Sequence, residues 1–379
     1  MKFAKLVFKN ILRNKRRTAL TISSLVVSLF LIISLATVLT ELERGTSEAN
    51  PLRLVTRHAV SLTFPLPIAD VERIRAVPGV KDAMPFSWFG GIWKDEKNFF
   101  ANFATDPVRL RSIISEIKMS DPEWQAFIGD RQGAIVGKKL VTLYGFQPGQ
   151  RITLKSPIYN AEVEFIIRGV CAGGDEKTMY FHNDYLNELL PDWAKDKVGT
   201  ISMIANTPED VPKVAQAIDS IFVNTDAPTK TETEREFALS FQTMFGGVKQ
   251  FLYAIMAAIT FSVLLVMGNT MAMTVRERTK EVGTLKAIGF KRHTIAILFL
   301  VEALLVATIG GVIGIGGATL LYRSVDFGTY IPFFQSFVPT NETLIGAFAL
   351  SILVGLISVL YSAYRVSGLT IAQALRSTE

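Results

Sequence analysis

Residues 18–40 read TALTISSLVVSLFLIISLATVLT, a run of 23 residues without Asp, Glu, Lys or Arg. At 1.5 Å per residue, about 20 helical residues cross the ~30 Å hydrocarbon layer of a membrane. A secretory signal peptide has a shorter apolar region of about 7–15 residues, followed by a small-residue cleavage site. This run is longer than that and no convincing cleavage site follows it, so it predicts a retained membrane helix.

Three further windows have the same character, at residues 251–275, 294–322 and 343–364. Glu302 is the one acidic residue within them. A helix satisfies its own backbone hydrogen bonds inside a bilayer, so each window is predicted to be a transmembrane helix. Four spans use only part of the chain, which excludes a carrier with many spans.

The overall composition is an average of unlike segments. The 379 residues are 49% hydrophobic and 20% charged, and their mean hydropathy is +0.31. A fully soluble enzyme and a disordered chain are both excluded by this balance. The single cysteine, Cys171, excludes an intramolecular disulfide and a cysteine-based metal site.

Basic residues predict the orientation of the four spans. Residues 1–17 hold seven Lys and Arg and no acid, and the basic excess continues in residues 276–293 and 365–379. With four spans these three segments lie on one side, which the positive-inside rule identifies as the cytoplasm. Residues 1–17 are predicted to form an amphipathic basic helix on the inner leaflet. Residues 41–250 and the short loop 323–342 are then extracytoplasmic.

The segment 41–250 alternates strand-like and helix-like runs, which indicates an α+β domain, expected in two subdomains. Predicted strands and helices alternate with turns such as Pro78-Gly79 and Pro148-Gly149. Residues 226–233 are polar and rich in turn formers, so we expect a hinge there. The predicted fold class is an α-helical membrane protein with four transmembrane helices and a large α+β extracytoplasmic domain between helices one and two.

No catalytic, cofactor-binding or metal site is predicted. His58 and His182 are isolated in sequence, and no His or carboxylate group has metal-ligand spacing. The segment 133–138 is rich in glycine but lacks the spacing and the hydroxyl residue of a phosphate-binding loop. Cys171 ends an apolar strand-like run and is expected to be a buried structural thiol.

The segment between spans two and three is a short, highly charged helix that is expected to end at Gly289. Glu277 and Glu281 share one face of this helix, and Arg278 can pair with Glu281. An apolar stripe is formed on it by Val282, Leu285 and Ile288. Such a helix can dock into a cytoplasmic partner or lie among lipid headgroups. Its amphipathic pattern fits both possibilities equally.

The same segment carries a family resemblance. RERTKEVGTLKAIG at 276–289, followed by LVEA at 300–303 and GGVIG at 310–314, resembles the permease signature of the MacB/LolC/FtsX superfamily of ABC transporters, also called type VII or mechanotransmission transporters. The resemblance extends over the whole chain, and its other matching segments are FKNILRNKRRT at 8–18, IVGKKL at 135–140, PGQ at 148–150 and the less similar tail AYRVSGLTIAQALR at 363–376.

The resemblance implies a mechanism for the chain. Such a permease carries a stalk and a MacB-like periplasmic domain, and residues 276–293 form a coupling helix that docks on an ATPase subunit. The residues expected to couple to the ATPase or to fix this helix are Arg276, Glu277, Arg278, Glu281, Gly283, Lys286 and Gly289. Because Glu302 lies near the cytoplasmic end of span three, a structural pairing is favoured over proton transfer.

Two further groups of residues are expected to pack helices or to meet cargo. Gly310, Gly314 and Ala318 form a small-residue face that allows close approach of another span, in the same subunit or across a dimer. Phe237, Phe241 and Phe245 recur every four residues before span two, and line either a stalk helix core or an apolar cargo face.

The expected partners follow from the same resemblance. No ATPase domain fits in the 17 residues before span one, so ATP and Mg are expected in a separate ATPase subunit. A second permease copy or a homologous permease is expected as a dimer partner in the bacterial inner membrane, with membrane lipids around it and with an adaptor and an outer-membrane channel as further candidates. The function is then export of a cargo such as a lipid, lipoprotein, peptide or drug-like molecule. The alternative is a signalling scaffold that activates a cell-wall hydrolase and transports nothing.

Overall fold

The computed structural model describes residues 12–47, 49–96, 98–244, 246–325, 327, 337–370 and 373. The chain divides into two compact units. The helical unit comprises residues 1–40, 245–327 and 337–379, and the α+β unit comprises residues 41–244 with 328–336.

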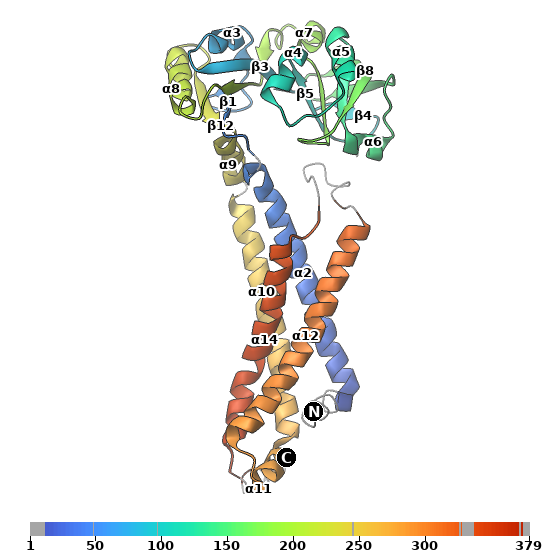
Figure 1. Ribbon diagram of the computed structural model, residues 1–379, viewed down its shortest axis with the longest axis vertical. Helices are drawn as coiled ribbons and strands as arrows, with labels where there is room; N and C mark the ends of the chain where they lie inside the picture. Colours follow the sequence, from blue (N-terminus) through green and yellow to red (C-terminus); the bar gives the residue numbers. More distant parts are fainter. Residues whose placement is uncertain are drawn as a thin grey trace. The chain divides into compact units, whose positions relative to one another are not determined.

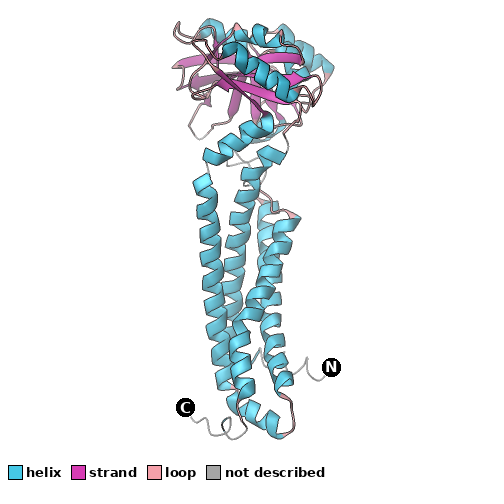
Figure 2. Cartoon of the chain, turned by 90° about the vertical axis from the view of Figure 1, so that its left-hand side faces the viewer, coloured by secondary structure: helices cyan, strands magenta, loops and turns pink. Residues whose placement is uncertain are grey.

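Four long helices dominate the helical unit, and Figures 1 and 2 show them side by side. Each is long and apolar enough to cross a membrane, and each extends beyond its predicted window. The described helices begin with the short η1 at Leu12–Asn14 and continue as α2 (Lys15–Ser47), α10 (Gly246–Glu277), α11 (Thr279–Ala287), α12 (Arg292–Ser324) and α14 (Asn341–Gly368). The predicted amphipathic helix 1–17 falls mostly outside the described residues, and residues 15–17 belong to α2.

Small residues allow the long helices to pack closely. A Cβ atom added to Gly310 would lie 2.6 Å from the Leu25 side chain on α2, and one added to Gly314 would lie 3.3 Å from Leu29. Ala318 continues this face and is fully buried. The small-residue face of α12 therefore packs within the subunit, against the first span.

The α+β unit is built on one ten-stranded sheet in the order β12-β1-β11-β3-β5-β9-β6-β8-β7-β4. Its strands are β1 (Arg53–His58), β3 (Val80–Trp88), β4 (Ile92–Trp93), β5 (Ala101–Thr105), β6 (Gly133–Gly137), β7 (Arg151–Ser156), β8 (Ala161–Cys171), β9 (Thr178–His182), β11 (Thr200–Ala205) and β12 (Thr229–Thr233), while β2 (Leu66–Pro67) pairs with β10 (Lys197–Val198). Its helices are α3 (Asp70–Arg75), α4 (Pro107–Ile113), α5 (Asp121–Gly129), α6 (Lys138–Tyr144), α7 (Asn183–Leu189), α8 (Val211–Phe222) and α9 (Glu234–Met244).

Side chains alternate between the two faces of this sheet, as expected for strands buried on both sides. In β9, Met179 and Phe181 face the core that α6 and α7 cover, whereas Tyr180 faces the core under α4 and α5. A third core lies at the other end of the sheet, under α3 and α8. The α+β unit, which was expected to form two subdomains, thus has three described cores on one continuous sheet.

The hinge expected at residues 226–233 is not what the structure shows. Thr229–Thr233 form β12, an edge strand that pairs antiparallel with β1. The strand is polar, yet Thr229 and Thr231 are buried and donate hydrogen bonds to Asp219 on α8. The threonine hydroxyl groups, which made the segment resemble a turn in the sequence, thus have hydrogen-bond partners on the neighbouring helix α8.

Candidate functional site

The segment between α10 and α12 is a separate short helix. Glu277 ends α10, and Arg278 leaves helical geometry with φ −102° and ψ 11°, so α11 begins only at Thr279. Within the predicted coupling segment 276–293, residues 276–277 therefore belong to α10 and residues 292–293 to α12, with α11 between them. Figure 1 shows α11 connecting the neighbouring ends of α10 and α12.

Gly289 ends this helical segment, as predicted. Its φ of +99° lies in the left-handed region that favours glycine. Phe290 donates its amide to the Leu285 carbonyl, and Gly289 donates to the Lys286 carbonyl. This pair of hydrogen bonds is a Schellman motif, which satisfies carbonyl groups left over at the end of a helix.

The apolar stripe predicted on α11 is divided in the structure. Val282 is 1% exposed and packs against the bundle, and Gly283 beside it is also buried. Ile288 is instead 71% exposed. The outward face of the segment carries Ile288 with exposed Lys280, Thr284 and Ala287.

Six charged residues form a network at this end of the bundle, which we call the Arg278 cluster: Arg13, Arg17, Glu277, Arg278, Glu281 and Glu302. Arg278 donates from Nη1 to Glu302 Oε2 at 2.6 Å and from Nε to Glu281 Oε2 at 3.0 Å. Glu281 also pairs with Arg13. Arg17 binds both carboxylate oxygens of Glu277, at 2.8 and 3.0 Å.

These pairs join the segment to α10, to α12 and to the chain at the start of the first span. The arginines before the first span hold α10 and α11, and Arg278 ties α11 to α12. The intramembrane acid Glu302 is only 7% exposed and has a direct ion-pair partner, so the favoured structural pairing is present. Sequence reasoning found Glu277, Arg278 and Glu281 but missed Arg13 and Arg17 as their partners.

The carboxyl group of Glu281 is held in its charged form. Burial by itself raises its pKa, but the hydrogen bonds from Arg13 and Arg278 outweigh burial and lower the pKa below its ordinary value. The same carboxylate raises the pKa of the Arg13 guanidinium. Both groups are thus charged at neutral pH, as a stable ion pair requires.

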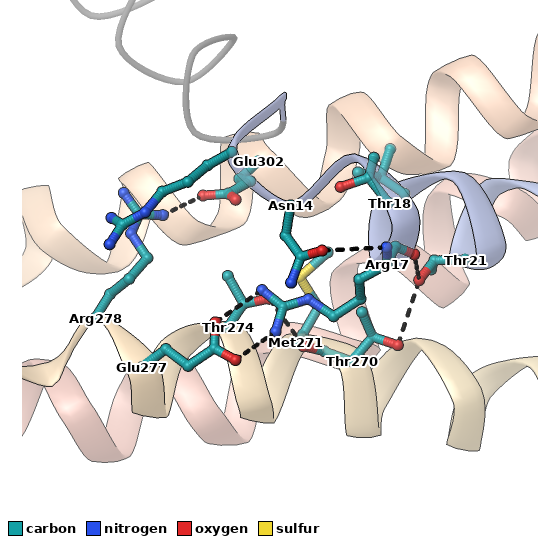
Figure 3. Close-up of a pocket in the computed structure, with 12 residues that line it drawn as sticks. Asn14, Arg17, Thr18, Thr21, Thr270, Met271, Thr274, Glu277, Arg278 and Glu302 are labelled. Atoms are coloured by element: carbon teal, nitrogen blue, oxygen red, sulfur yellow. Dashed lines mark hydrogen bonds and ion pairs between the residues drawn. The ribbon is translucent and has the colours of Figure 1, made fainter.

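A polar cavity of about 210 Å³ lies beside the cluster. Figure 3 shows Arg17 bonded to Glu277 in the lining of this cavity, and Arg278 paired with Glu302. Thr21 on α2 donates to Thr270 on α10 at 3.3 Å. Because its arginines are matched by nearby carboxylates, the cavity offers no excess positive charge for an anion.

The end of α14 also holds the segment. Lys286 donates from Nζ to the backbone carbonyl of Leu369. The Arg292 guanidinium lies 4.3 Å from the centroid of the Tyr364 ring and donates to the Tyr364 carbonyl at 3.4 Å. Of the predicted coupling residues, Lys286 therefore anchors α11, whereas Arg276 is exposed.

The three phenylalanines predicted to line a stalk helix do not share one described helix. Phe237 and Phe241 belong to α9, which ends at Met244. Phe245 lies outside the described residues, and α10 begins after it at Gly246. Phe237 is half-buried. The predicted role of this face stays a prediction.

A second arginine network, unpredicted from the sequence, lies in the α+β unit. Arg53 is 8% exposed on its side chain and donates to Glu116 at 2.7 Å, to Glu234 at 2.8 Å and to the Ile113 carbonyl at 3.0 Å. Glu234 also accepts from the Asn50 backbone amide at 2.7 Å. We call these five residues the Arg53 cluster; it joins the chain entering the unit to helix α9, through which the chain leaves.

Cys171 and His182, the isolated residues that could have had a catalytic role, are both buried in the structure. Burial raises the pKa of the Cys171 thiol to about 12, which keeps it protonated and confirms the expected buried thiol. Burial lowers the pKa of His182, whose Nε2 is bonded to the Phe127 carbonyl. Within the described ranges, no group of three or more His, Cys, Asp or Glu is arranged to hold a metal ion.

Two family models match the chain. The MacB-like periplasmic core domain matches residues 18–221, and the FtsX-like permease C-terminal model matches residues 253–371. The chain therefore belongs to the family of proteins with a MacB-like periplasmic core domain, joined here to an FtsX-like permease region.

Related proteins are ABC transporter permeases. ABC transporter permease MJ1507 of Methanocaldococcus jannaschii is 23% identical over 97% of this chain and 96% of its own length. The pyoverdine export ATP-binding/permease protein PvdT of Pseudomonas fluorescens is 26% identical over 86% of this chain. A macrolide export ATP-binding/permease protein MacB of Bdellovibrio bacteriovorus is 24% identical over 81% of it. The chain spans about half the length of these two export proteins, 49% of each.

Solved structures resemble the α+β unit. The periplasmic region of MacB from Actinobacillus actinomycetemcomitans matches with a TM-score of 0.38 and 10% identity, over 53% of this chain and 95% of that one. The extracellular domain of YknZ from Gram-positive bacteria matches with a TM-score of 0.36 and 12% identity, over 48% of this chain and all of that one. The family and the four spans define a membrane-embedded ABC transporter permease with an extracellular MacB-like domain.

Proposed function

We propose that this chain couples ATP hydrolysis by a separate ATPase subunit to movement of its extracellular domain, and that this movement drives export or extraction of a cargo. The observation that carries the proposal is the construction of α11. Its inner side is fixed to the bundle through the Arg278 cluster and Lys286, while its outer side presents Ile288. A rigid helix with one exposed apolar side chain suits docking in a groove of a partner protein.

The attachments of α11 give a route for force. A push on α11 reaches α12 through Arg278 and Glu302, and reaches η1, directly before α2, through the pair of Arg13 with Glu281. In the α+β unit, the Arg53 cluster ties Asn50, shortly after α2, to Glu234, which begins the helix before α10. The Arg53 cluster is thus a bonded point where the chain enters and leaves this unit, and it is the basis for proposing mechanotransmission.

Support for export comes from the relatives. Two of them are named for export of macrolides and of pyoverdine, which supports export as the function. A drug-like molecule or a peptide is the proposed cargo. A lipid or lipoprotein fits the same mechanism. We further propose a dimer with a second copy or a homologous permease in the inner membrane, served by an adaptor and an outer-membrane channel.

The proposal is tested by purifying the tagged permease together with the ATPase that accompanies it. Ile288→Asp should reduce ATPase recovery and permease-stimulated hydrolysis at least tenfold, because it places a charge in the apolar contact. Ile221→Asp is the matched control, since Ile221 is an exposed isoleucine on α8 of the other unit. Unchanged stimulation by the Ile288 variant contradicts the proposed docking, and recovery of a cell-wall hydrolase in place of transport partners would favour the signalling alternative.

A further inference from the structure

A cavity of about 680 Å³ lies in the α+β unit where two parallel strands end. β5 and β9 run parallel, with Thr105 opposite His182 at their carboxyl ends, and both residues line the cavity. Open sheets with helical connections commonly bind ligands outside the carboxyl ends of their strands. The volume lies within the range of about 300–1,000 Å³ found for ligand sites. This cavity is separate from the Arg278 cluster and from the Arg53 cluster.

Buried polar side chains line this cavity. Thr105 is 0% exposed, His182 is 6% exposed and Asn183 is 5% exposed. The His182 ring is fixed by its hydrogen bond to the Phe127 carbonyl at 2.7 Å. Asn183 differs, because its side-chain amide bonds to no residue in the part of the chain that the structure describes. Its amide oxygen and nitrogen are not among the described buried atoms that lack a partner, so they are open to the cavity and available to a ligand.

The rest of the lining narrows the chemistry of that ligand. Val71, Pro85 and Ile128 supply apolar walls. The lining holds two basic residues, Arg75 and Arg131, and three acidic ones, Glu72, Asp106 and Asp184. With both charges present it does not select for a strongly charged molecule. An asparagine amide offers a donor and an acceptor together, which matches the N–H and C=O of a peptide group.

We propose that this cavity binds a peptide segment, with a backbone peptide group on Asn183 and an apolar side chain against Val71, Pro85 and Ile128. The site does not depend on ATP coupling, so it goes beyond the function proposed above. The same backbone chemistry is offered by a free peptide and by an extended segment of a partner protein. The two sources are separated by the second arm of the test.

The first arm uses the full-length permease in detergent and a mixture of acetylated, amidated hexapeptides as the probe. After gel filtration, mass spectrometry identifies the retained peptides. Asn183→Leu should lower retention at least tenfold by removing both hydrogen bonds. Val108→Trp should do the same by filling the cavity from an exposed position, where folding is not at risk. Asn206→Leu, at an exposed asparagine outside the cavity, should retain the peptides as the unaltered chain does.

The second arm places a photo-crosslinking residue at Val108 in intact cells. Adducts of a few hundred to a few thousand daltons identify a free peptide, and adducts that digest to one recurring segment of a partner identify a protein source. Failure of the unaltered chain to retain any hexapeptide overturns the proposal. Retention by Asn183→Leu and Val108→Trp that equals retention by the unaltered chain also overturns the proposal, as does a crosslink confined to lipid. The variants at Asn183 and Val108 are expected to leave ATPase stimulation unchanged. Failure of peptide binding is therefore distinguishable from failure of the proposed ATPase coupling.

Discussion

The Arg278 cluster and the Arg53 cluster both place one arginine between two glutamates, yet they differ in access to water. The Arg53 side chain is 8% exposed and is hydrogen-bonded to two carboxylates and a backbone carbonyl. Arg278 is 15% exposed, but its partner Glu281 is 43% exposed and Arg13 beyond it is 66% exposed. In the Arg53 cluster the guanidinium is enclosed although its acids Glu116 and Glu234 are 38% and 28% exposed, whereas the Arg278 cluster continues through Glu281 to the exposed Arg13.

This difference in exposure predicts different energetic costs for breaking the two sets of ion pairs. A buried arginine that loses its partners leaves charges without compensation, which costs several kcal/mol. Exposed ion pairs contribute about 0–1 kcal/mol and weaken with salt. The Arg53 cluster is therefore suited to a permanent connection, and the outer pairs of the Arg278 cluster are suited to rearrangement when a partner pushes on α11.

The largest effect is expected from Arg53→Ala. The variant leaves Glu116 and Glu234 without their cation and should destabilise the α+β unit by about 3 kcal/mol, at the low end for a broken buried pair because both acids retain contact with water. Denaturant unfolding followed by tryptophan fluorescence measures this in the full chain, since all four tryptophans lie in this unit. Arg235→Ala, at the exposed neighbour of Glu234, is the control; equal losses in both variants contradict the account.

A smaller effect is expected from Glu302→Ala. Arg278 then loses its buried partner but keeps Glu281, so the helical unit should lose about 1–3 kcal/mol. Heat-induced loss of monodisperse protein in detergent provides the measurement. Glu342→Ala removes an exposed acid at the start of α14 and should change little. A Glu302 variant as stable as the unaltered chain rules out a structural role for this pair.

Salt should distinguish the two clusters without any substitution. Raising NaCl from 0.1 to 1 M shortens the screening length from about 10 to 3 Å, which weakens the exposed pairs of Arg13 and Arg17. Hydrogen exchange should therefore increase in α11 and remain unchanged in β1. The same increase in both elements would show that exposure does not separate the clusters.

The smallest effect concerns the pH response of α11. Because the pKa of Glu281 is lower in the folded chain than its ordinary value of 4.5, its pairing stabilises the segment above that pH. This contribution is lost as the pH falls through the lowered pKa. A spin label on Thr284→Cys should become more mobile over that range, and buried Cys171 should stay unlabelled. Arg13→Ala should move the transition to higher pH; an unmoved transition argues against the pair.

The sequence predicted the spans, the position of α11 and its stop at Gly289, because hydrophobic runs and helix ends are local signals. It did not predict that Arg13 pairs with Glu281, 268 residues away, because tertiary folding creates that contact. For the same reason Arg53 was not identified as a site residue. Helix α5 was missed although its capping box, Ser120 with Glu123, is a local signal that could have been found.

The most direct test of the central claim measures hydrogen exchange in the permease–ATPase complex with and without ATP. The account predicts that ATP changes exchange both in α11 and in residues 229–244, which lead from β12 through α9 toward the membrane helices. Ile288→Asp should abolish both changes, whereas Ile221→Asp should preserve them. Stimulated ATP hydrolysis that leaves exchange in residues 229–244 unaltered would contradict the claim that α11 drives the extracellular domain.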